Sequence, residues 1–576
     1  MQHPLRACSS AVLAFVKTGV NLTIEAGVTV RATAGTPAAA LVIERGAKIF
    51  ALGTQQEPIT FTSATGIQDP NDPEFDPATA RGRWGGLIIL GNAPIIGGEN
   101  SVEGLPEGMG LYGGNDPDDS SGVLRFVRVW FGGSEISPDN EINGITFAGV
   151  GRGTEVDHIE VAYNLDDGVE FFGGTVNAKF ISVLFCGDDG IDTDEGYQGK
   201  LQFVFVITGT SGHHGFEMDS VGDETPRSSP QIYNVLIVGG STDPGMVTSD
   251  QQKNGLIRLR EGTGAHLGNL ITVNVADKAV WLSNCTDALT VTQDIENRSG
   301  PDTLYFSPGN MLGPHTAPVR TSIGCRGKEL RSWSKEEPNL VMVAETINDT
   351  VLFIDPRPRT GSSPVYRAVD DVPADFFTPV DYRGAFGEDL WLSGWSLLDE
   401  FGLIPDNVFG EFQEGVIQSD ATWRSDTLHL LADQVFVASG ATLTIQPGAV
   451  IKAYRDNGSG RAPSLVIERG AKILAEGRAD RPITFTSVLN PRHLPARGTW
   501  GGVVILGNGL TSKGVSNVEG LEGVEYGGNN PDDDSGVLTY VRVWYGGDKI
   551  APDNEINGVT FGAVGARTVV DHLEVA

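Results

Sequence analysis

Much of this amino-acid sequence occurs twice, and the repetition restricts the fold more than any other feature. The segment from Leu41 to Ile49 returns unchanged from Leu465 to Ile473, and Asp157 to Ala162 returns as Asp571 to Ala576 with one substitution. The separation between equivalent residues stays between 414 and 424, so one long module occurs in tandem. The acidic segments that follow Ala162 in the first copy have no counterpart in the second, which we therefore expect to be truncated.

Short apolar runs that end at glycine, asparagine or aspartate predict β-strands along the chain. Ile159, Ile181 and Val204 recur at intervals of 22 and 23 residues. A second series, whose members each follow a glycine or an alanine, recurs at a similar interval with one longer step: Ile145, Val169, Ile191, Phe216, Leu256 and Val280. Two interleaved strand series with one period, and no helical pattern, predict a coil that returns above itself.

The predicted fold is all-β, a right-handed parallel β-helix or solenoid, in tandem copies of which the second is truncated. Inward Val, Ile, Leu and Phe side chains would stack rung upon rung at about 4.8 Å. Propeller blades need repeats of about 40 residues, and a leucine-rich horseshoe needs helices. A β-sandwich would show turn signals about every 8 to 12 residues, without the longer recurrence that aligns equivalent strands from rung to rung.

The register lapses and returns, which divides the chain into four predicted parts. These are a first β-helix at 1–308, an irregular aromatic-rich tail packed on it at 309–405, a connector at 406–426, and a second, incomplete β-helix at 427–576. The ends of a coil are open sheet edges that can pair with another chain. The segment from Val569 to Ala576 reads as a rung without a cap. We therefore expect either that the native protein continues beyond it or that something covers this edge, for which self-association through the open terminal rung is the candidate.

Composition and charge exclude several classes of partner. The formal net charge is −33, which argues against binding nucleic acid, because phosphates would be repelled. No run of 18 apolar residues is present, so no transmembrane helix is expected. Cys285 and Cys325 could pair in an oxidising compartment, whereas Cys186 lies in an apolar run and is expected to be a core residue.

Acidic residues and histidines recur at the coil period on three successive rungs. Asp167, Asp189 and His214 fall at the turn that enters each strand. One row further on, outward-facing carboxylates are expected at Glu170, Asp192 and Glu217, with Arg258 and Arg260 on the next rung.

Carboxylates about 5 Å apart repel each other by roughly 3 kcal/mol per pair at an effective dielectric constant near 20. A bound cation, raised pKa values or arginine pairing would relieve this repulsion. Calcium takes about six to eight oxygen ligands. We therefore name Glu170, Asp192 and Glu217 as candidate Ca²⁺ ligands. Asp-Gly pairs are also ordinary turn residues, so a purely structural role is an open alternative.

A second acidic element occurs in both copies. Clustered oxygen side chains that end at a glycine are similar to half of a calcium loop. The candidate ligands are Asp118, Asp119 and Ser120 in the first copy and Asp532, Asp533 and Asp534 in the second. The alternative is a polar turn. His158 and His572 occupy one slot of the repeat and are expected to face outward on the surface.

Several motifs together resemble a family of secreted bacterial surface proteins, whose best-known members are spirochaete outer-membrane lipoproteins of the 48-kilodalton type. The residues that carry the resemblance are Leu41 to Ile49, Trp84 to Gly86, Gly113 to Asp119, Asn140 to Gly144 and Tyr382 to Trp395. The resemblance implies a β-helix and an extracellular or cell-surface location at the bacterial outer membrane. It implies no catalytic residues, and this chain shows no export signal of adequate length.

The order of the acidic rungs is also similar to the site of polygalacturonase-type β-helix hydrolases. By that resemblance Asp167, Asp188 and Asp189 would act as acid and base, while His214 and Arg258 would hold a sugar acid, with Arg260 beside them. This sequence departs from the pattern, because Leu-Asp-Asp replaces Asn-Thr-Asp and Arg-Leu-Arg replaces Arg-Ile-Lys.

The leading functional prediction is an extracellular or cell-surface β-helix protein with a structural, adhesive or assembly role, stabilised by calcium. The alternative is a hydrolase or lyase that acts on acidic glycans through Asp167, Asp189 and His214. A third reading is a glycan-binding module that uses Trp130 and Tyr112 as exposed aromatic side chains.

Overall fold

The computed structural model describes residues 7–10, 13–33, 38–102, 105–106, 108–134, 142–300, 302–313, 319–343, 346, 348–359, 363–456, 460–495, 497–518, 521, 523–551 and 554–576. The chain forms two compact units. Unit 1 comprises Met1–Asn339, Glu345–Val351 and Ser363–Phe401, and unit 2 comprises Leu340–Ala344, Leu352–Ser362 and Gly402–Ala576. Asn140 and Glu141 of the repeated segment Asn140 to Gly144 lie outside the described residues.

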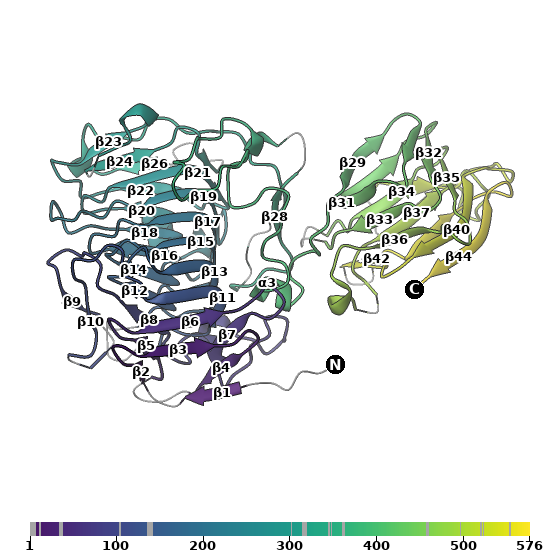
Figure 1. Ribbon diagram of the computed structural model, residues 1–576. Coiled ribbons are helices and arrows are strands. Elements are labelled where there is room, and N and C mark those ends of the chain that lie inside the picture. Colours follow the sequence, from purple (N-terminus) through teal and green to yellow (C-terminus); the bar gives the residue numbers. More distant parts are fainter. Residues whose placement is uncertain are drawn as a thin grey trace. The chain divides into compact units, whose positions relative to one another are not determined.

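Unit 1 is a parallel β-helix whose rungs contribute to two long sheets (Figure 1). The 14-stranded sheet contains β1 (Ala7–Ser10), β3 (Asn21–Ile24), β4 (Thr29–Ala32), β6 (Lys48–Leu52), β7 (Ile59–Ser63), β11 (Gly122–Trp130), β13 (Glu155–Ala162), β15 (Asn177–Leu184), β17 (Lys200–Gly209), β19 (Gln231–Gly239), β21 (Ala265–Val273), β23 (Thr290–Thr292), β24 (Thr303–Phe306) and β25 (Met311–Leu312). The 10-stranded sheet contains β2 (Ala14–Val16), β5 (Leu41–Ile43), β8 (Leu87–Leu90), β12 (Ile145–Ala148), β14 (Val169–Phe172), β16 (Ile191–Asp194), β18 (Phe216–Met218), β20 (Ile257–Leu259), β22 (Val280–Leu282) and β26 (Val319–Thr321).

The predicted parallel β-helix is confirmed, and so is most of its register. Val169 pairs with Ile191, and Ile191 pairs with Phe216, one rung at a time. The next member is Ile257 and not Leu256, because the carbonyl of Leu256 takes the place that a glycine carbonyl has in the rungs below. The coil also continues beyond residue 308 through β25 and β26, so the predicted start of the tail is wrong.

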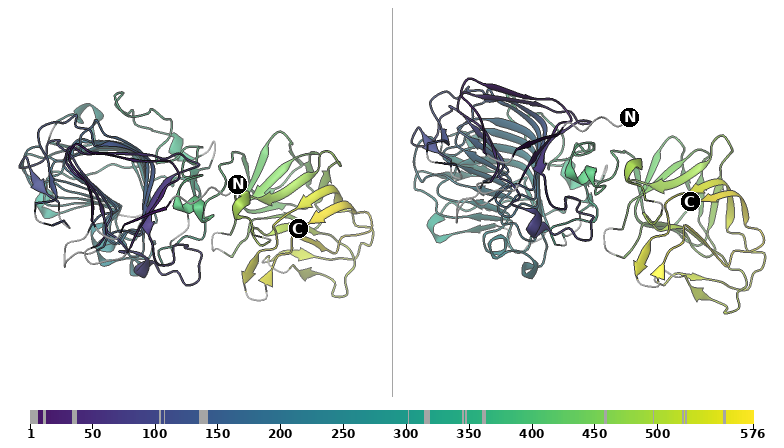
Figure 2. Two further views of the ribbon diagram at one scale, coloured as in Figure 1. Left: turned by 60° about the horizontal axis from the view of Figure 1, so that its bottom comes forward. Right: turned by 90° about the horizontal axis from the view of Figure 1, so that it is seen from below.

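Apolar side chains fill the inside of the coil, and the rungs wind round one axis (Figure 2). Val169, Ile191 and Phe216 are fully buried in this core. Cys186 is buried and unbonded, as predicted. Cys285 and Cys325 form a disulfide at the end of the coil, which agrees with the predicted pairing.

An aromatic column runs up the outside of the 14-stranded sheet. Phe126, His158, Phe180 and Phe203 each adopt a positive φ, between 49° and 59°, where their strands bend. Their rings stack at centroid distances of 4.2, 4.3 and 4.8 Å. Stacking offsets the roughly 1–2 kcal/mol that a left-handed backbone costs each residue. His158 is therefore not a surface histidine, because neighbouring rings and the tail cover it.

The aromatic-rich tail packs along this column, as predicted for Trp391 and Trp395. It runs back down the coil: Asn269 donates to Asp370 O at 3.1 Å, and Asn234 donates to Tyr382 O at 2.9 Å. Trp395 lies beside Phe126, and the short helix α3 (Leu397–Glu400) follows it. The tail thus replaces solvent over the outer face of unit 1.

Unit 2 is a second, shorter parallel coil. Its 12-stranded sheet contains β29 (Glu411–Ile417), β30 (Ala421–Trp423), β31 (Leu428–Val437), β32 (Thr442–Ile445), β33 (Val450–Ala453), β34 (Ser464–Ile467), β35 (Lys472–Glu476), β36 (Ile483–Ser487), β37 (Gly502–Leu506), β40 (Gly536–Val543), β43 (Val559–Gly562) and β44 (Val569–Val575). The predicted connector at 406–426 is wrong, because β29 and β30 within it form the first rung of this coil.

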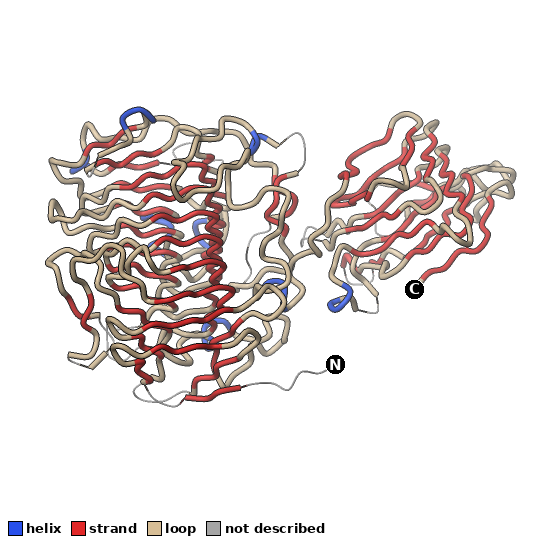
Figure 3. The backbone as a smooth tube through the Cα atoms, viewed as in Figure 1, coloured by secondary structure: helices blue, strands red, loops and turns tan. Residues whose placement is uncertain are grey.

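Four antiparallel pairs and a few short helices complete the described structure, in which loops and strands dominate (Figure 3). The pairs join β9 (Asn100–Ser101) to β10 (Leu111–Tyr112), β27 (Leu340–Met342) to β28 (Asp355–Pro358), β38 (Ser516–Asn517) to β39 (Glu525–Tyr526), and β41 (Lys549–Ala551) to β42 (Asn554–Glu555). The other helices are α1 (Pro77–Ala80), α2 (Ser249–Asn254), η1 (Pro244–Met246), η2 (Ile295–Asn297), η3 (Ile323–Cys325), η4 (Pro364–Tyr366) and η5 (Pro491–His493). Among the described residues no helix has the length and apolar character needed to span a membrane.

Candidate functional site

The acidic wall is a group of nine side chains on three neighbouring rungs of unit 1. They lie on the turns before β14, β16 and β18 and on the first residues of these strands: Asp166, Asp167, Glu170, Asp188, Asp189, Asp192, His213, His214 and Glu217. The parallel register of the three strands brings residues that are 22 to 25 positions apart in sequence onto adjacent rungs. The predicted stacking of the acidic motifs is therefore present.

The innermost row of the wall consists of Asp167, Asp189 and His214. An Oδ1 atom of Asp167 accepts the backbone N–H of Asp189 at 2.9 Å, and Oδ1 of Asp189 accepts the backbone N–H of His214 at 2.6 Å. The same Asp189 oxygen lies 2.7 Å from His214 Nδ1. Asp189 is 2% exposed and His214 is 1% exposed. These side chains tie each turn to the next rung, which is the structural role that the sequence left open.

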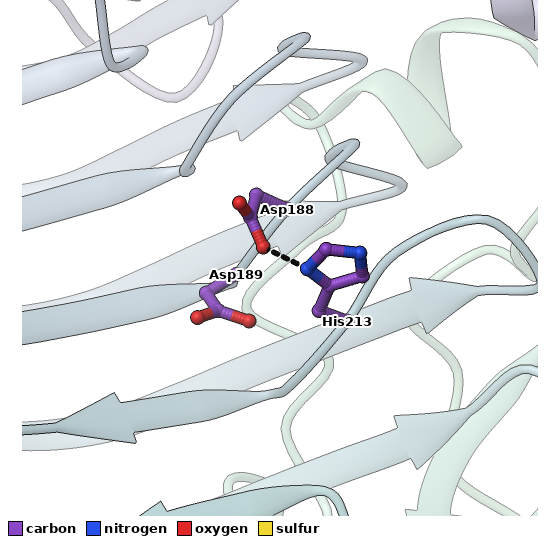
Figure 4. Close-up of side chains that lie close together, drawn as sticks. All are labelled: Asp188, Asp189 and His213. Atoms are coloured by element: carbon purple, nitrogen blue, oxygen red, sulfur yellow. Dashed lines mark ion pairs between the residues drawn. The ribbon is translucent and has the colours of Figure 1, made fainter. Parts of the chain in front are cut away.

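The outer row of the turns is accessible to solvent. Asp188 and His213 form an ion pair on neighbouring rungs, and both are partly exposed (Figure 4). The hydrogen bond to Asp188 raises the pKa of His213 to about 9, so this imidazole is protonated at neutral pH. Asp188 is thus the one predicted acid or base that a substrate could reach from this row.

The third row runs along the strands themselves. Glu170, Asp192, Glu217 and Arg258 are paired in register from rung to rung, as predicted for the three carboxylates. Arg258 Nη1 lies 2.6 Å from Glu217 Oε1, so the arginine neutralises the upper end of the row. Of the lower carboxylates, Glu170 is buried and Asp192 is half-buried.

Arg260 lies on the same rung as Arg258 and neutralises a carboxylate that the sequence reasoning missed. Its Nη2 lies 2.5 Å from Asp219 Oδ2, and its Nε lies 3.4 Å from Glu217 Oε1. Burial nevertheless raises the pKa of Asp219 to about 6. Both predicted arginines therefore serve as ion-pair partners at the upper edge of the acidic wall.

Burial and mutual repulsion together disfavour negative charge in the wall. Burial, and then the charges of neighbouring carboxylates, raise the pKa of Asp167, Asp189 and Asp192 well above the usual range. For Asp192 those neighbours are Glu217, Asp219, Asp189 and Asp194. Burial lowers the pKa of His214 to about 4, so this ring is neutral at pH 7.

Several buried polar atoms of the wall have no hydrogen-bond partner among the described residues. They are Asp192 Oδ1, His214 Nε2 and Asn143 Oδ1. Asn143 belongs to the same site, because its Nδ2 donates to Glu170 Oε2. Sequence reasoning missed Asn143, although it precedes Gly144 as Asp167 precedes Gly168 and could have been found from that pattern.

Ligand atoms of the wall lie close enough for a metal ion. One group of three consists of carboxylates alone, from Asp167, Glu170 and Asp192, whose oxygens lie within 4.8 Å of one another. Another group adds a histidine nitrogen, from Asp189, His214 and Glu217. An all-oxygen group suits a hard cation such as Ca²⁺, whereas imidazole suits zinc and other transition metals.

The second predicted calcium loop has a different geometry. Asp118 pairs with Arg152 at 2.9 Å, and Asp119 accepts hydrogen bonds from the backbone and side chain of Asn92. Ser120 lies between these acids and the following strand. Protein donors thus contact both carboxylates, and calcium binding by this loop stays a prediction.

The equivalent loop of unit 2 behaves in the same way. Asp533 accepts hydrogen bonds from Asn508 Nδ2 at 3.2 Å and from Ser535 Oγ at 3.0 Å, and Asp534 pairs with Lys472 at 2.6 Å. Asp532 is exposed beside them. In the described part of either loop, no three ligand atoms from His, Cys, Asp or Glu side chains lie within 4.8 Å of one another.

The prediction that Trp130 and Tyr112 are exposed aromatics is wrong. Trp130 is buried beneath the tail, and its Nε1 donates to Glu160 Oε1 at 3.0 Å. Tyr112, at the end of β10, is buried in a cluster with Ile95 and Val102, and its ring lies 6.0 Å from that of Phe172. Trp130 is covered by a segment that is remote in sequence, and strand periodicity does not reveal such a cover.

Comparison with known protein families identifies the family to which this β-helix belongs. The family model described as a pectate-lyase-like β-helix domain matches residues 10–299 and 415–576, which cover both copies of the repeat. The chain belongs to this family. No curated protein and no solved structure matches the chain. Membership of the pectate-lyase-like β-helix family accounts for the coil and for the weaker of the two sequence resemblances.

Proposed function

We propose that this pectate-lyase-like β-helix protein acts outside the cell or at the cell surface, in a structural, adhesive or assembly role, with Ca²⁺ bound at the acidic wall. The observation that carries the proposal is the group formed by Asp167, Glu170 and Asp192. Three carboxylates meet there within 4.8 Å, and Asp192 Oδ1 has no hydrogen-bond partner among the described residues.

Electrostatics favour a cation at this group. Two carboxylates about 5 Å apart repel by roughly 3 kcal/mol at an effective dielectric constant near 20. Arg258 and Arg260 contact Glu217 and Asp219 at the upper edge of the wall. Asp167, Glu170 and Asp192 lie close to one another below that edge. At neutral pH the wall must therefore hold protons or bind a cation, and a calcium ion relieves the repulsion without protonation.

The chemistry of the donors selects calcium. Asp167, Glu170 and Asp192 offer carboxylate oxygens, and Asn143 offers a buried amide oxygen beside Glu170. Calcium binds six to eight oxygen ligands or so in flexible geometry, and a wall of carboxylates on adjacent rungs supplies several of them.

Two features support a location outside the cytoplasm. The disulfide between Cys285 and Cys325 is of the kind that persists in oxidising compartments. The resemblance to spirochaete surface lipoproteins implies the same setting. For assembly, we propose pairing of strands between chains: among the described strands β44 pairs with β40, and a strand edge that is not covered can pair with another chain. A glycan is the second partner that this role would include.

Substitution of Asp192 by asparagine tests the calcium site, because it should change the melting temperature in opposite directions with a chelator and with Ca²⁺. In the presence of a chelator, Asp192→Asn should raise the melting temperature of unit 1, because the change removes a buried charge from a repulsive group. In the wild-type chain, Ca²⁺ at a hundredfold excess over Kd should add about 3 kcal/mol of stability. The variant should lose most of this gain, as measured by thermal unfolding and titration calorimetry.

Asp118→Asn is the matched control, because it removes an exposed acid from the other predicted loop and should leave calcium binding unchanged. Wild-type protein whose melting temperature does not respond to Ca²⁺ would refute the proposal. Binding of Zn²⁺ but not Ca²⁺ would also refute it, since the group with His214 would then be the site.

Hydrolysis or lysis of an acidic glycan is the second candidate, and the exposed Asp188–His213 pair is the observation in its favour. Asp189 and His214 are buried and hydrogen-bonded to the turns, so any acid–base chemistry would fall to Asp188. Release of reducing sugar or unsaturated product from polygalacturonate, lost in Asp188→Asn with the fold intact, is the expected result. Absence of any product from the wild-type chain removes this candidate.

A further inference from the structure

A cavity of about 170 Å³ in unit 2 is lined by three arginines. Its walls come from three separate parts of the chain, all of which belong to this unit. We call it the arginine pocket, and its charged lining residues are Arg359, Asp433, Arg455, Asp456 and Arg461. Three guanidinium groups thus line one small cavity in a chain whose formal net charge is −33.

The arginine pocket lies at a corner of the coil where β31 changes its pairing partner. The first part of β31 pairs with β33 and its last part pairs with β34 (Figure 1). Asp433 lies between the two parts, because Leu431 is the last residue paired with β33 and Val435 is the first paired with β34. The loop that joins β33 to β34 contributes Arg455 near its start and Arg461 near its end. One loop therefore brings two of the three arginines to the pocket.

The two copies of the repeat differ in sequence at this corner. The equivalent strands of the first copy, β4 and β5, are joined by a loop that contains Ala-Gly-Thr-Pro at 34–37, whereas the second copy has Arg-Asp-Asn-Gly-Ser-Gly-Arg at 455–461. Asp433 of the second copy likewise takes the place of Val12. The first copy makes the same connection without a charged residue in the loop, so the path of the chain does not by itself account for the two arginines.

Arg359 reaches the arginine pocket from the end of β28 and is held there by three contacts. Its Nη1 pairs with Glu414, its Nη2 donates to Val341 O at 3.2 Å, and its guanidinium group lies 5.7 Å from the centre of the Phe412 ring. Val341 and Met342 line the pocket and are buried in an apolar cluster. A cation that is already fixed beside an apolar surface loses little freedom when it binds an anion, and the low local dielectric strengthens the attraction.

The two lining carboxylates accept hydrogen bonds from the backbone. Asp456 Oδ2 accepts the N–H of Gly460 at 3.0 Å, which holds the two ends of the loop close together. Asp433 Oδ1 accepts the N–H of Gln434 at 2.7 Å, and Asp433 is exposed, so solvent weakens its repulsion of an anion. A guanidinium group has about five N–H donors, so the hydrogen bonds of Arg359 to Glu414 and Val341 leave it N–H groups for a ligand.

We propose that the arginine pocket binds a tetrahedral oxyanion, a sulfate or phosphate group, between Arg359, Arg455 and Arg461. A planar carboxylate is satisfied by the edge of one guanidinium group, through two parallel hydrogen bonds. A sulfate or phosphate group presents oxygens in several directions, so it can accept from guanidinium groups that come from different parts of the chain. A free ion and an ester group on a glycan share this chemistry. The inference goes beyond the proposed function, because it concerns unit 2 and needs no calcium.

Titration calorimetry of the full chain tests this site with sodium sulfate and sodium phosphate, and with sodium acetate as the planar anion, at an ionic strength held constant with sodium chloride. The wild-type chain should give a saturable heat with sulfate or phosphate, and Arg455→Gln and Arg461→Gln should each weaken binding about tenfold, the usual cost of a lost hydrogen bond between charged groups. Asp433→Asn should strengthen binding about threefold, because it removes a neighbouring negative charge. Arg424→Gln is the matched control, since Arg424 is an exposed arginine of unit 2 that pairs with Asp426 and does not line the pocket.

Dextran sulfate separates the two sources of the anion. Binding that is tighter than that of free sulfate and is lost in Arg455→Gln assigns the ligand to an ester group, whereas dextran sulfate binding that Arg455→Gln leaves unchanged assigns the ligand to the free ion. The proposal fails if the wild-type chain gives no saturable heat with sulfate or phosphate, if acetate binds as tightly as sulfate, or if Arg424→Gln weakens binding as much as Arg455→Gln does. Calcium binding should be unchanged in Arg455→Gln, so each of the two proposals can fail without the other.

Discussion

Glu160 joins the tail to the coil from a fully buried position. Its carboxylate accepts hydrogen bonds from Trp130 Nε1, Ser182 Oγ and the backbone N–H of Leu397. Burial raises its pKa to about 7, against the opposing effects of the hydrogen bonds and Arg128. In the unfolded chain this carboxyl titrates near 4.5, so the folded state holds a proton that the unfolded state has already released.

Unit 1 should therefore lose stability as the pH rises from about 4.5 to 7, because the unfolded state binds fewer protons in this window. Glu160→Gln should abolish this part of the pH dependence, since the amide can accept at Oε1 and donate to Ser182. Glu160→Ala should destabilise by about 3 kcal/mol at any pH, because buried donors lose their acceptor. Thermal unfolding at pH 5 and pH 8 measures both effects; an unchanged pH profile in Glu160→Gln would contradict this account.

At the scale of single residues, the sequence predicted which side chains lie on adjacent rungs better than it predicted which side chains are exposed to solvent. The period placed Asp167, Asp189 and His214 on adjacent rungs, because stacking follows from spacing alone. It could not show that their side chains turn inward to cap the next rung, since that depends on the turn conformation. It also placed His158 on the surface, because the tail that covers it lies more than 200 residues away in the chain.

At the scale of elements, two glycines fix where a long outer strand begins. Gly122 at the start of β11 has a φ of +114°, and a Cβ there would lie 1.9 Å from Ile49 O. Gly536 at the start of β40 has a φ of +112° and the same 1.9 Å distance to Ile473 O. Each glycine lets its strand approach the rung below more closely than any side chain allows.

Gly122→Ala should lower the stability of unit 1 by about 3 kcal/mol or more, and Gly536→Ala should do the same to unit 2. The obstacle in each case is a backbone carbonyl, which cannot move without breaking the register. Gly97→Ala is the control, because open space surrounds that position and its φ of +75° carries only a backbone cost. Equal losses in Gly97→Ala and Gly122→Ala, measured by urea unfolding, would show that φ rather than contact is responsible.

The two units show where the sequence failed at the scale of the whole molecule. A repeat period locates the regular coil but gives no signal in segments without strands, so the boundaries at 309 and 406 were wrong. Unit 2 contains part of the predicted tail: β27 pairs with β28, and Asp355 accepts the hydroxyl of Tyr454 at 2.8 Å. Phe353 packs with Tyr454 in the same cluster.

A fragment that begins at residue 406 should therefore melt roughly 10 °C below one that begins at residue 338, because it lacks Val341, Phe353 and Asp355. Tyr454→Phe in the longer fragment separates the contributions, since it removes only the hydrogen bond to Asp355. Circular dichroism melting curves of the three proteins provide the measurement. Equal melting temperatures for the two fragments would mean that the segment is dispensable for unit 2.

The turn carboxylates give the stack a polarity. Asp167 accepts a hydrogen bond from the backbone N–H of Asp189 on the next rung, and Asp189 accepts one from the backbone N–H of His214 on the rung after that. On these rungs, a backbone N–H of the later turn donates to the carboxylate of the turn before it. Removal of the Asp167 carboxylate would leave the buried backbone N–H of Asp189 without this acceptor, so a defect in one turn weakens the rung that follows it in the sequence.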